Sequence, residues 1–301
     1  MALVTQDSRN IGEDSGHGLG DRMRKLLRGH SIEITAKDVN SLSEAAQLVP
    51  AGTSISVTFL PGEDVDARVA AAGAAKRLGF SPVSHISARR LKSTAELETF
   101  LSRLAQHGVE SAFVVAGDPA QPEGPFEDAL AVIQSGLLAK HGIGRVGISG
   151  YPEGHPQISE EKLWRALKDK HAALKALGHE CEITTQFGFD AGPVLTWLER
   201  VREEGIEAKV RVGVAGPASV KTLLRFAARC GVGASAKVMA KYGVSITKLL
   251  TTAGPDRIIE EFASGLNPRI HGDVALHFYP FGGVKNTAEW VAHFAGLEAV
   301  R

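Results

Sequence analysis

The sequence predicts an α/β fold in which eight strand–helix units close into a TIM (β/α)8 barrel. Short apolar runs alternate with longer amphipathic segments from residue 31 to residue 297, which is the pattern of parallel strands joined by helices. The units occupy about 270 residues without a linker, and this count and length are typical of a closed barrel. A doubly wound open sheet is the alternative, but residues 35–38, after the first strand, lack a phosphate-loop sequence.

The clearest single unit is a buried strand that begins at residues 145–148 and that Gly150 cuts short. The polar turn that follows carries a stacking ring and two titratable groups, in Tyr151, Glu153 and His155. Parallel α/β proteins place their chemistry at the carboxyl ends of strands. This turn is therefore expected to contribute to a functional site.

The other elements follow from the same patterns, with Ser or Asp caps before several helices. The predicted strands cover residues 31–35, 54–59, 82–87, 111–115, 145–148, 182–187, 208–212 and 273–278. The predicted helices cover residues 41–48, 64–78, 93–107, 126–140, 160–177, 193–204, 218–229, 255–264 and 287–297. Residues 231–240 are rich in Gly and Ala and are expected to hold no more than a short helix at Ser235.

Residues 1–29 are predicted to be a polar extension with one short helix, and residues 30–301 to be a single catalytic barrel. Residues 21–28 are basic and amphipathic, which predicts a helix that covers the bottom of the barrel. Residues 16–20 read Gly-His-Gly-Leu-Gly and imitate a dinucleotide loop. Because no strand precedes them, no nucleotide site is expected there.

The composition excludes several classes of protein. The 34 basic and 34 acidic residues give a formal net charge of zero, and no block of like charge indicates a nucleic-acid or membrane partner. No apolar run approaches the ~18–20 residues of a membrane-spanning helix, and the first residues lack the order of a signal peptide. Cys181 and Cys230 are too few for a disulfide framework, so a cytoplasmic location is expected.

Glu33 is the most informative side chain in the first predicted strand. It lies between Ile32 and Ile34, so in a strand it points to the face opposite to theirs. If the two isoleucines face the outer helices, Glu33 faces the barrel axis, where burial would raise its pKa toward that of an acid useful at neutral pH. The alternative is a glutamate at the exposed rim of the strand.

Other polar side chains also follow predicted strands: Thr58, His85, Asp118 and Gln186. Asp118 stands in a Gly-Asp-Pro sequence, which is equally compatible with an ordinary turn. Eleven histidines are present without a His-x-His or HExxH pattern, so no dedicated metal site is expected. Isolated histidines in such a barrel are more often structural than catalytic.

Seven short motifs occur in order along the chain, mostly at the ends of predicted strands. They are Ser31-Ile32-Glu33, Val57-Thr58, His85-Ile86-Ser87, Gly117-Asp118-Pro119, residues 150–156, residues 185–190 and His277-Phe278-Tyr279. Each motif is modest alone, but their order and spacing make the set specific. Over most of residues 31–295, the set resembles methylenetetrahydrofolate reductase of the bacterial type.

That family folds as an eight-stranded barrel and reduces 5,10-methylenetetrahydrofolate to 5-methyltetrahydrofolate with NAD(P)H and FAD. The resemblance implies an oxidoreductase of one-carbon metabolism that acts on a CH–NH group of a tetrahydrofolate derivative. It implies that Glu33 is the general acid that opens the five-membered ring, and that Asp118 stabilises the resulting iminium cation. The implied substrate contacts are Asp118, Gln186, Phe226 and Tyr279. The implied cofactor contacts are Thr58, His85, Tyr151, His155 and Lys170.

The chain departs from the family where a flavin would be held. Ala116 and Asp169 stand where the resemblance calls for basic residues, and an expected arginine is missing at residues 281–283. Charge-assisted phosphate contacts contribute ~1.5–3 kcal/mol each, so these departures predict weak FAD binding. FAD stays the cofactor that the resemblance implies, and direct hydride transfer from NAD(P)H to folate is left open as the alternative. Arg89 and Arg90 are the candidates to replace the missing charge.

Two alternatives to a folate-dependent reductase stay open. One is a pterin-binding barrel without hydride transfer, such as a methyl-transferring protein, and the other is a non-catalytic relative that binds folate or flavin. The expected partners are a tetrahydrofolate derivative and, at most, further copies of this chain.

Overall fold

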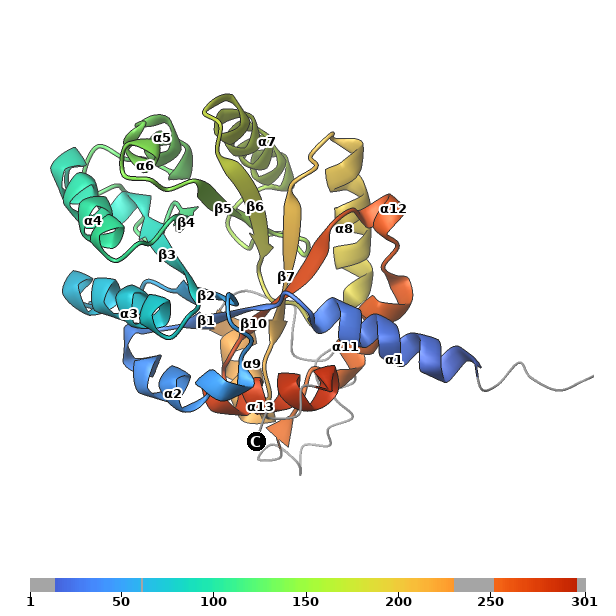
Figure 1. The fold of residues 1–301 in the computed structure, drawn as a ribbon. Coiled ribbons are helices and arrows are strands. Elements are labelled where there is room, and N and C mark those ends of the chain that lie inside the picture. Colours follow the sequence, from blue (N-terminus) through green and yellow to red (C-terminus); the bar gives the residue numbers. More distant parts are fainter. Residues whose placement is uncertain (1–13, 61, 230–251, 297–301) are drawn as a thin grey trace, which may run out of the picture.

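Eight parallel strands close into a barrel around which helices form an outer ring (Figure 1). The structure is a computed structural model that describes residues 14–60, 62–229 and 252–296. The strands neighbour one another in the order β1, β2, β3, β4, β5, β6, β7 and β10, and β10 pairs with β1 to close the ring. The prediction of a TIM (β/α)8 barrel is thereby confirmed.

The barrel strands lie close to the predicted positions. They are β1 (Ser31–Ile34), β2 (Ser54–Val57), β3 (Ser81–Ser87), β4 (Ser111–Val115), β5 (Arg145–Gly150), β6 (Glu180–Thr185), β7 (Lys209–Ala215) and β10 (Val274–Tyr279). The longer helices are α1 (Asp14–Leu27), α3 (Val65–Arg77), α4 (Thr94–Gln106), α7 (Glu160–Ala176), α8 (Ala191–Glu203), α9 (Val220–Arg229), α11 (Asp256–Gly265) and α13 (Val284–Ala295). The shorter helices are α2 (Val39–Glu44), α5 (Ala129–Gln134), α6 (Leu137–Lys140) and α12 (Pro268–His271).

The main hydrophobic core lies between the strands and the helices. Ile32 and Ile34 of β1 are fully buried in it, as are Ile55 and Val57 of β2. Successive strand residues point to opposite faces, so the residues between these aliphatic side chains face the barrel axis. Inside the barrel the lining is largely polar, and Gly147 there leaves room for the ring of Phe113.

Helix α1 is longer than the predicted segment 21–28, and it packs on α11 and α13. Met23, Leu26 and Leu27 on one side of it are buried in the main core. The chain then reaches the amino-terminal end of the barrel, where Arg211 donates a hydrogen bond to the carbonyl of Gly29 over 2.9 Å. The predicted basic helix therefore belongs to the packed part of the fold.

Several elements differ from the prediction for local reasons. The helix expected at 126–140 divides into α5 and α6 because Gly136 has a φ of 73°, which a right-handed helix cannot contain. Strand β5 extends two residues beyond the predicted 145–148 and ends at Gly150, where no Cβ fits against the ring of Trp197. A small antiparallel pair, β8 (Ala218–Ser219) and β9 (Thr252–Ala253), was not expected. Residues 231–240, with Ser235, lie outside the described residues.

Candidate active site

Glu33 lies inside the barrel, between a histidine of β3 and a histidine of the adjacent strand β10. Its Oε2 is 3.8 Å from Nε2 of His85 on β3 and 3.8 Å from Nε2 of His277 on β10. The Glu33 side chain is 20% exposed, whereas Ile32 and Ile34 on either side of it are buried on the outer face. Both distances exceed a normal hydrogen bond, so the carboxylate approaches the histidines without being hydrogen-bonded to them.

The two histidines are held differently. Nδ1 of His277 lies 2.8 Å from Oγ of Ser31, a hydrogen bond that fixes its ring from the first strand. His85 packs against the ring of Phe113, with a centroid distance of 4.8 Å. Burial lowers the pKa of His85 from 6.5 to about 4, although the charge of Glu33 opposes this shift. His85 is therefore neutral at pH 7.

Asp118 stands at the rim, in the turn after β4. Its side chain is 79% exposed, and its Oδ2 is 3.8 Å from Nη2 of Arg90. The turn needs a glycine at 117, which has a φ of 93° and where a Cβ would lie 2.0 Å from Oγ of Ser87. The Gly-Asp-Pro sequence thus forms a tight turn and also presents a carboxylate at the mouth of the barrel.

The ends of β5 and β6 bring three further predicted residues to the same end of the barrel. The backbone N–H of Gln186 donates to the carbonyl of Gly150 over 3.0 Å, which ties the two strand ends together. The side-chain Oε1 of Gln186 accepts the N–H of Phe187. Tyr151 and His155 make an edge-to-face contact with centroids 5.5 Å apart. Side chains within the turn after β5 thus pack against one another.

An aromatic cluster covers the side of the mouth formed by β10 and α9. Tyr279 donates a hydrogen bond to the carbonyl of Thr185, and its ring lies over Gly213, where a Cβ would be 2.8 Å from it. Phe226 stacks on Phe281 with centroids 4.1 Å apart and planes 12° apart. Phe281 belongs to the segment 281–283, where the resemblance implies an arginine. This segment therefore contributes an aromatic contact rather than a positive charge.

The remaining cofactor candidates do not all lie at the mouth. Thr58 follows β2 directly, and its N–H donates to the carbonyl of Ile34 over 2.8 Å. Lys170 is only 8% exposed, and the titratable groups near it are Asp128 and Cys181. Burial lowers the pKa of Lys170 to about 8. The Lys170 ammonium is therefore enclosed within the fold, and its assignment to a cofactor stays a prediction.

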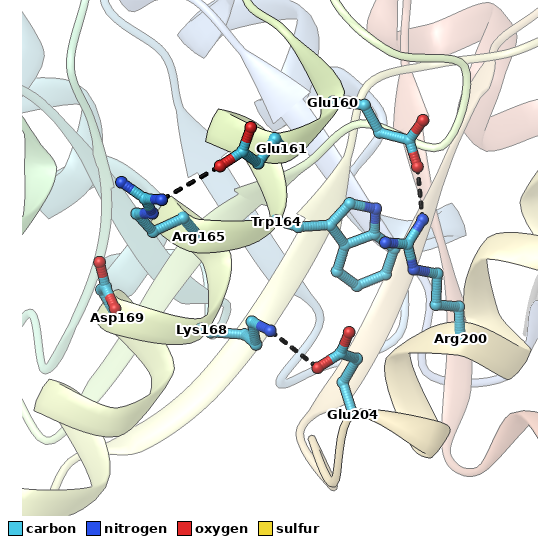
Figure 2. A pocket seen from close by; sticks show the side chains of 8 residues that line it. All are labelled: Glu160, Glu161, Trp164, Arg165, Lys168, Asp169, Arg200 and Glu204. Atoms are coloured by element: carbon cyan, nitrogen blue, oxygen red, sulfur yellow. Dashed lines mark hydrogen bonds and ion pairs between the residues drawn. The ribbon is translucent and has the colours of Figure 1, made fainter.

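Asp169 lies in a surface groove between α7 and α8 (Figure 2). The groove measures about 510 Å³, and Trp164 lines its floor. Its other charged groups pair with one another: Arg165 with Glu161, Lys168 with Glu204, and Arg200 with Glu160.

Two of the three basic candidates for a flavin diphosphate, Arg89 and Lys170, are engaged or enclosed within the fold. Arg89, a candidate to replace the missing charge, donates from Nε and Nη1 to the carbonyls of Glu127 and Pro119. Its guanidinium is thereby used to hold the loop after β4. Lys170 is enclosed and Asp169 is acidic and exposed, so Arg90 remains as the basic candidate beside the mouth.

The sequence did not identify Ser31, His277 and Arg90 as a set of neighbours of Glu33 and Asp118. The signal was present in part, because Ser31 precedes Glu33 by two residues and so shares its face of the strand. The described residues contain no group of three or more His, Cys, Asp or Glu arranged to hold a metal ion. None of the helices formed by these described residues is long and apolar enough to cross a membrane.

Fold and site together define a (β/α)8 barrel that places a carboxylic acid and two histidines inside the barrel. The sequence profile of the family described as methylenetetrahydrofolate reductase matches residues 34–281. This chain therefore belongs to the methylenetetrahydrofolate reductase family.

Its relatives within the family are distant. The chain is 23% identical over 203 residues to methylenetetrahydrofolate reductase (NADH) 1 of Arabidopsis thaliana, a match that covers 61% of this chain and 33% of that protein. It is 24% identical over 145 residues to methylenetetrahydrofolate reductase 2 of Saccharomyces cerevisiae, covering 46% of this chain and 24% of that protein. The matched region thus spans a third or less of the length of these relatives.

A solved structure shares the fold. It is an uncharacterised protein from Clostridium thermocellum, described as binding two copies of 5-methyl-5,6,7,8-tetrahydrofolic acid. The TM-score is 0.56 at 10% sequence identity, and the alignment covers 93% of this chain and 99% of that chain. At this identity the likeness supports the barrel fold alone.

Proposed function

We propose that this chain reduces 5,10-methylenetetrahydrofolate to 5-methyltetrahydrofolate, with NAD(P)H as the hydride donor. The observation that carries the proposal is Glu33, an acid held inside the barrel between His85 and His277 in a member of this family. Its oxygens have no hydrogen-bond donor among the described side chains at this position, so a substrate nitrogen can take that place.

In the proposed reaction, protonated Glu33 gives its proton to the ring nitrogen whose bond to the methylene carbon breaks. The five-membered ring opens, and the methylene carbon remains on the other nitrogen as an iminium cation. Hydride from the nicotinamide then adds to that carbon and completes the methyl group. Glu33 is left as a carboxylate and regains its proton from water. A positioned acid of this kind typically contributes ~10²–10⁴-fold to the rate.

Asp118 is proposed to hold the pterin and to stabilise the iminium charge. Its exposure at the rim leaves the carboxylate accessible to a ligand, and the guanidinium of Arg90 lies 3.8 Å from it. Gln186 is proposed to contact the same ring system from the end of β6. A fixed negative charge facing a developing cation lowers the barrier because it needs no reorganisation during the reaction.

For the cofactor we propose weak FAD binding. Tyr151, His155, Thr58 and His85 supply polar and aromatic groups at or near the mouth, but two of the three basic candidates for a diphosphate are engaged or enclosed within the fold. Ala116, which is uncharged, and Asp169, which is acidic, support the same conclusion, since neither can pair with a phosphate. No step of the proposed reaction therefore passes through a flavin, and the nicotinamide is placed against Tyr151.

The proposal is tested with the purified protein in two measurements. The visible spectrum should show little flavin absorbance, and NADH or NADPH should be oxidised when methylenetetrahydrofolate is added without FAD. A yellow protein that keeps one flavin per chain through dialysis would refute weak FAD binding. An absence of oxidation with either nucleotide, with or without added FAD, would refute the reductase itself.

A second candidate is a pterin-binding barrel without hydride transfer, either a methyl-transferring or a non-catalytic protein. It is favoured by the Clostridium thermocellum barrel, whose described ligand is methyltetrahydrofolate rather than its methylene precursor. The two candidates differ in one observable. A binding protein would bind 5-methyltetrahydrofolate in calorimetry without oxidising either nucleotide.

A further inference from the structure

A separate cavity of about 150 Å³ lies between α3 and α4, beyond the ends of β2 and β3. Aromatic, cationic and acidic side chains line it together. They are Phe59, Phe100, Arg68, Arg90, Glu96 and Glu123. His85 also borders the cavity, so this space lies next to the strand that carries a neighbour of Glu33.

Arg68 forms one wall of the cavity, and it is only 6% exposed. Its guanidinium lies between two rings, 4.7 Å from the centroid of Phe59 and 4.9 Å from that of Phe100. Nη1 donates to the carbonyl of His85 over 3.2 Å, but the buried Nε has no hydrogen-bond partner among the described residues. A buried donor without an acceptor is destabilising, so Arg68 favours an acceptor in the cavity.

Arg90 approaches the same phenyl ring, with its guanidinium 5.2 Å from the centroid of Phe59. It comes within 3.8 Å of Asp118 and of Glu123, distances at which charges attract but hydrogen bonds do not form. Its Nε is also buried without a partner. Two guanidinium groups therefore flank one aromatic ring, and each retains an unmatched donor.

This lining selects a flat and uncharged ring with both donors and acceptors. Phenyl rings and guanidinium planes favour stacking. The two arginines are balanced by Glu96 and Glu123, which disfavours a phosphate or carboxylate as the occupant. A cavity of about this volume holds a single small aromatic molecule. Ring nitrogens would accept from the arginines, and an exocyclic amine would donate to a glutamate.

We propose that this cavity receives the adenine base of NAD(P)H, an inference that rests on the proposed function. Adenine carries ring nitrogens as acceptors and one exocyclic amine as a donor. The pterin has similar chemistry, but in the proposed reaction it must reach Glu33 inside the barrel. The nucleotide can span both places, since its nicotinamide and its adenine are joined by a flexible diphosphate link. The adenine then anchors the donor from outside the barrel wall.

The test uses ADP-ribose, which contains the adenine but no nicotinamide, in titration calorimetry with the full chain. Phe59→Leu keeps an apolar side chain but removes the stacking surface, and Val65→Trp fills the cavity from α3 without deleting a charge. Each variant should weaken ADP-ribose binding about tenfold, the effect of losing one good contact. Arg103→Gln is the matched control, because Arg103 joins α4 to Asp66 of α3 at the surface.

Kinetics with a truncated donor complete the test. Reduced nicotinamide mononucleotide lacks the adenylate half, so its kcat/KM should be the same in wild type and in both variants, whereas that of NADH should fall about tenfold. Unchanged ADP-ribose affinity in both variants, or equal losses with both donors, would overturn the assignment. Binding of a free pterin in competition with ADP-ribose would assign the cavity to the folate instead. The calorimetry needs no turnover, so an inactive protein would refute the proposed function without deciding this site.

Discussion

Two glutamates inside the same barrel have opposite surroundings. Glu182 on β6 receives two hydrogen bonds from Arg211, of 2.8 and 3.1 Å, and Arg211 also binds the carbonyl of Gly29 at the amino-terminal end. Glu33 has two histidines at 3.8 Å, and burial keeps at least His85 neutral. One carboxylate is fully paired with a charge, and the other has only histidines beside it, at distances longer than a hydrogen bond.

This difference in pairing distinguishes a glutamate that stabilises the fold, Glu182, from a glutamate that is available for the reaction, Glu33. Removing one partner of a buried ion pair with good geometry greatly lowers the stability of the fold. The oxygens of such a paired carboxylate are already hydrogen-bonded and cannot also bind a ligand. The Glu33 carboxyl, which has no hydrogen bond to either histidine, can still accept a donor from a substrate. The comparison predicts that changes at Glu182 affect folding, whereas changes at Glu33 affect the reaction.

The largest effect is expected from Glu33→Gln. The amide cannot supply the proton that opens the folate ring, so kcat should fall by ~10²–10⁴-fold. Folate affinity and thermal stability should change little, because the amide has nearly the same shape. Turnover is measured by NADH oxidation with saturating methylenetetrahydrofolate, and near-normal rates would exclude Glu33 as the acid.

Glu182→Ala should produce the largest loss of stability. It leaves the guanidinium of Arg211 buried without its counter-charge, which typically costs about 3–5 kcal/mol. Chemical denaturation measures this loss, and the folded fraction should retain its kcat. The paired change of Glu182→Leu with Arg211→Met removes both charges and should recover most of the stability. A Glu182→Ala variant as stable as wild type would show that the Glu182–Arg211 pair does not stabilise the fold.

The pH dependence of stability should contain a contribution from His85. Its folded-state pKa is about 4, below the ordinary value of 6.5, so the unfolded chain binds more protons between these two pH values. Stability therefore rises with pH across that window, by about 3 kcal/mol if each pKa unit contributes about 1.4 kcal/mol. Below about pH 4 both states are protonated, and this contribution is lost.

The His85→Gln variant isolates that contribution. Its free energy of unfolding, measured at pH 4 and pH 7, should differ less between the two conditions than that of wild type. Groups that do not interact with His85 titrate equally in both proteins and cancel in the comparison. An identical pH dependence in the two proteins would show that His85 is not kept neutral by burial.

The smallest effect is expected from Asp118→Asn. The carboxylate is exposed at the rim, so its contribution to the iminium charge is partly screened by water. We expect kcat/KM for folate to fall about tenfold while the KM for NADH stays unchanged, since a charge-assisted hydrogen bond contributes ~1.5–3 kcal/mol. Equal losses for both substrates would assign Asp118 a structural role in the turn after β4.

The barrel was predictable because its strands are buried on the outer face and short. Runs such as 54–57 and 111–115 cannot be amphipathic helices, and their regular alternation with helices left a closed parallel sheet as the best solution. Glu33 was predictable for a related reason, because a charge between two isoleucines must face away from the core. Both inferences rest on local periodicity.

What escaped prediction depends on contacts between distant segments. Ser31 and His277 meet because the first and last strands close the barrel, and no local pattern reports that register. The cavity at Arg68 needs two helices and the ends of two strands to exist. The burial of Lys170 near Cys181 could not be predicted either, because a lysine in a helix is expected to be exposed unless its spatial neighbours are known.

The most direct test of the central claim follows the hydride itself. The protein is freed of flavin and given methylenetetrahydrofolate with NADH that carries deuterium on the transferred position of nicotinamide C4. Direct transfer predicts deuterium in the methyl group of 5-methyltetrahydrofolate, at the full enrichment of the donor, and a loss of this product in Glu33→Gln. Product that forms only when FAD is added, or that has exchanged its deuterium with water, would contradict direct transfer by this chain.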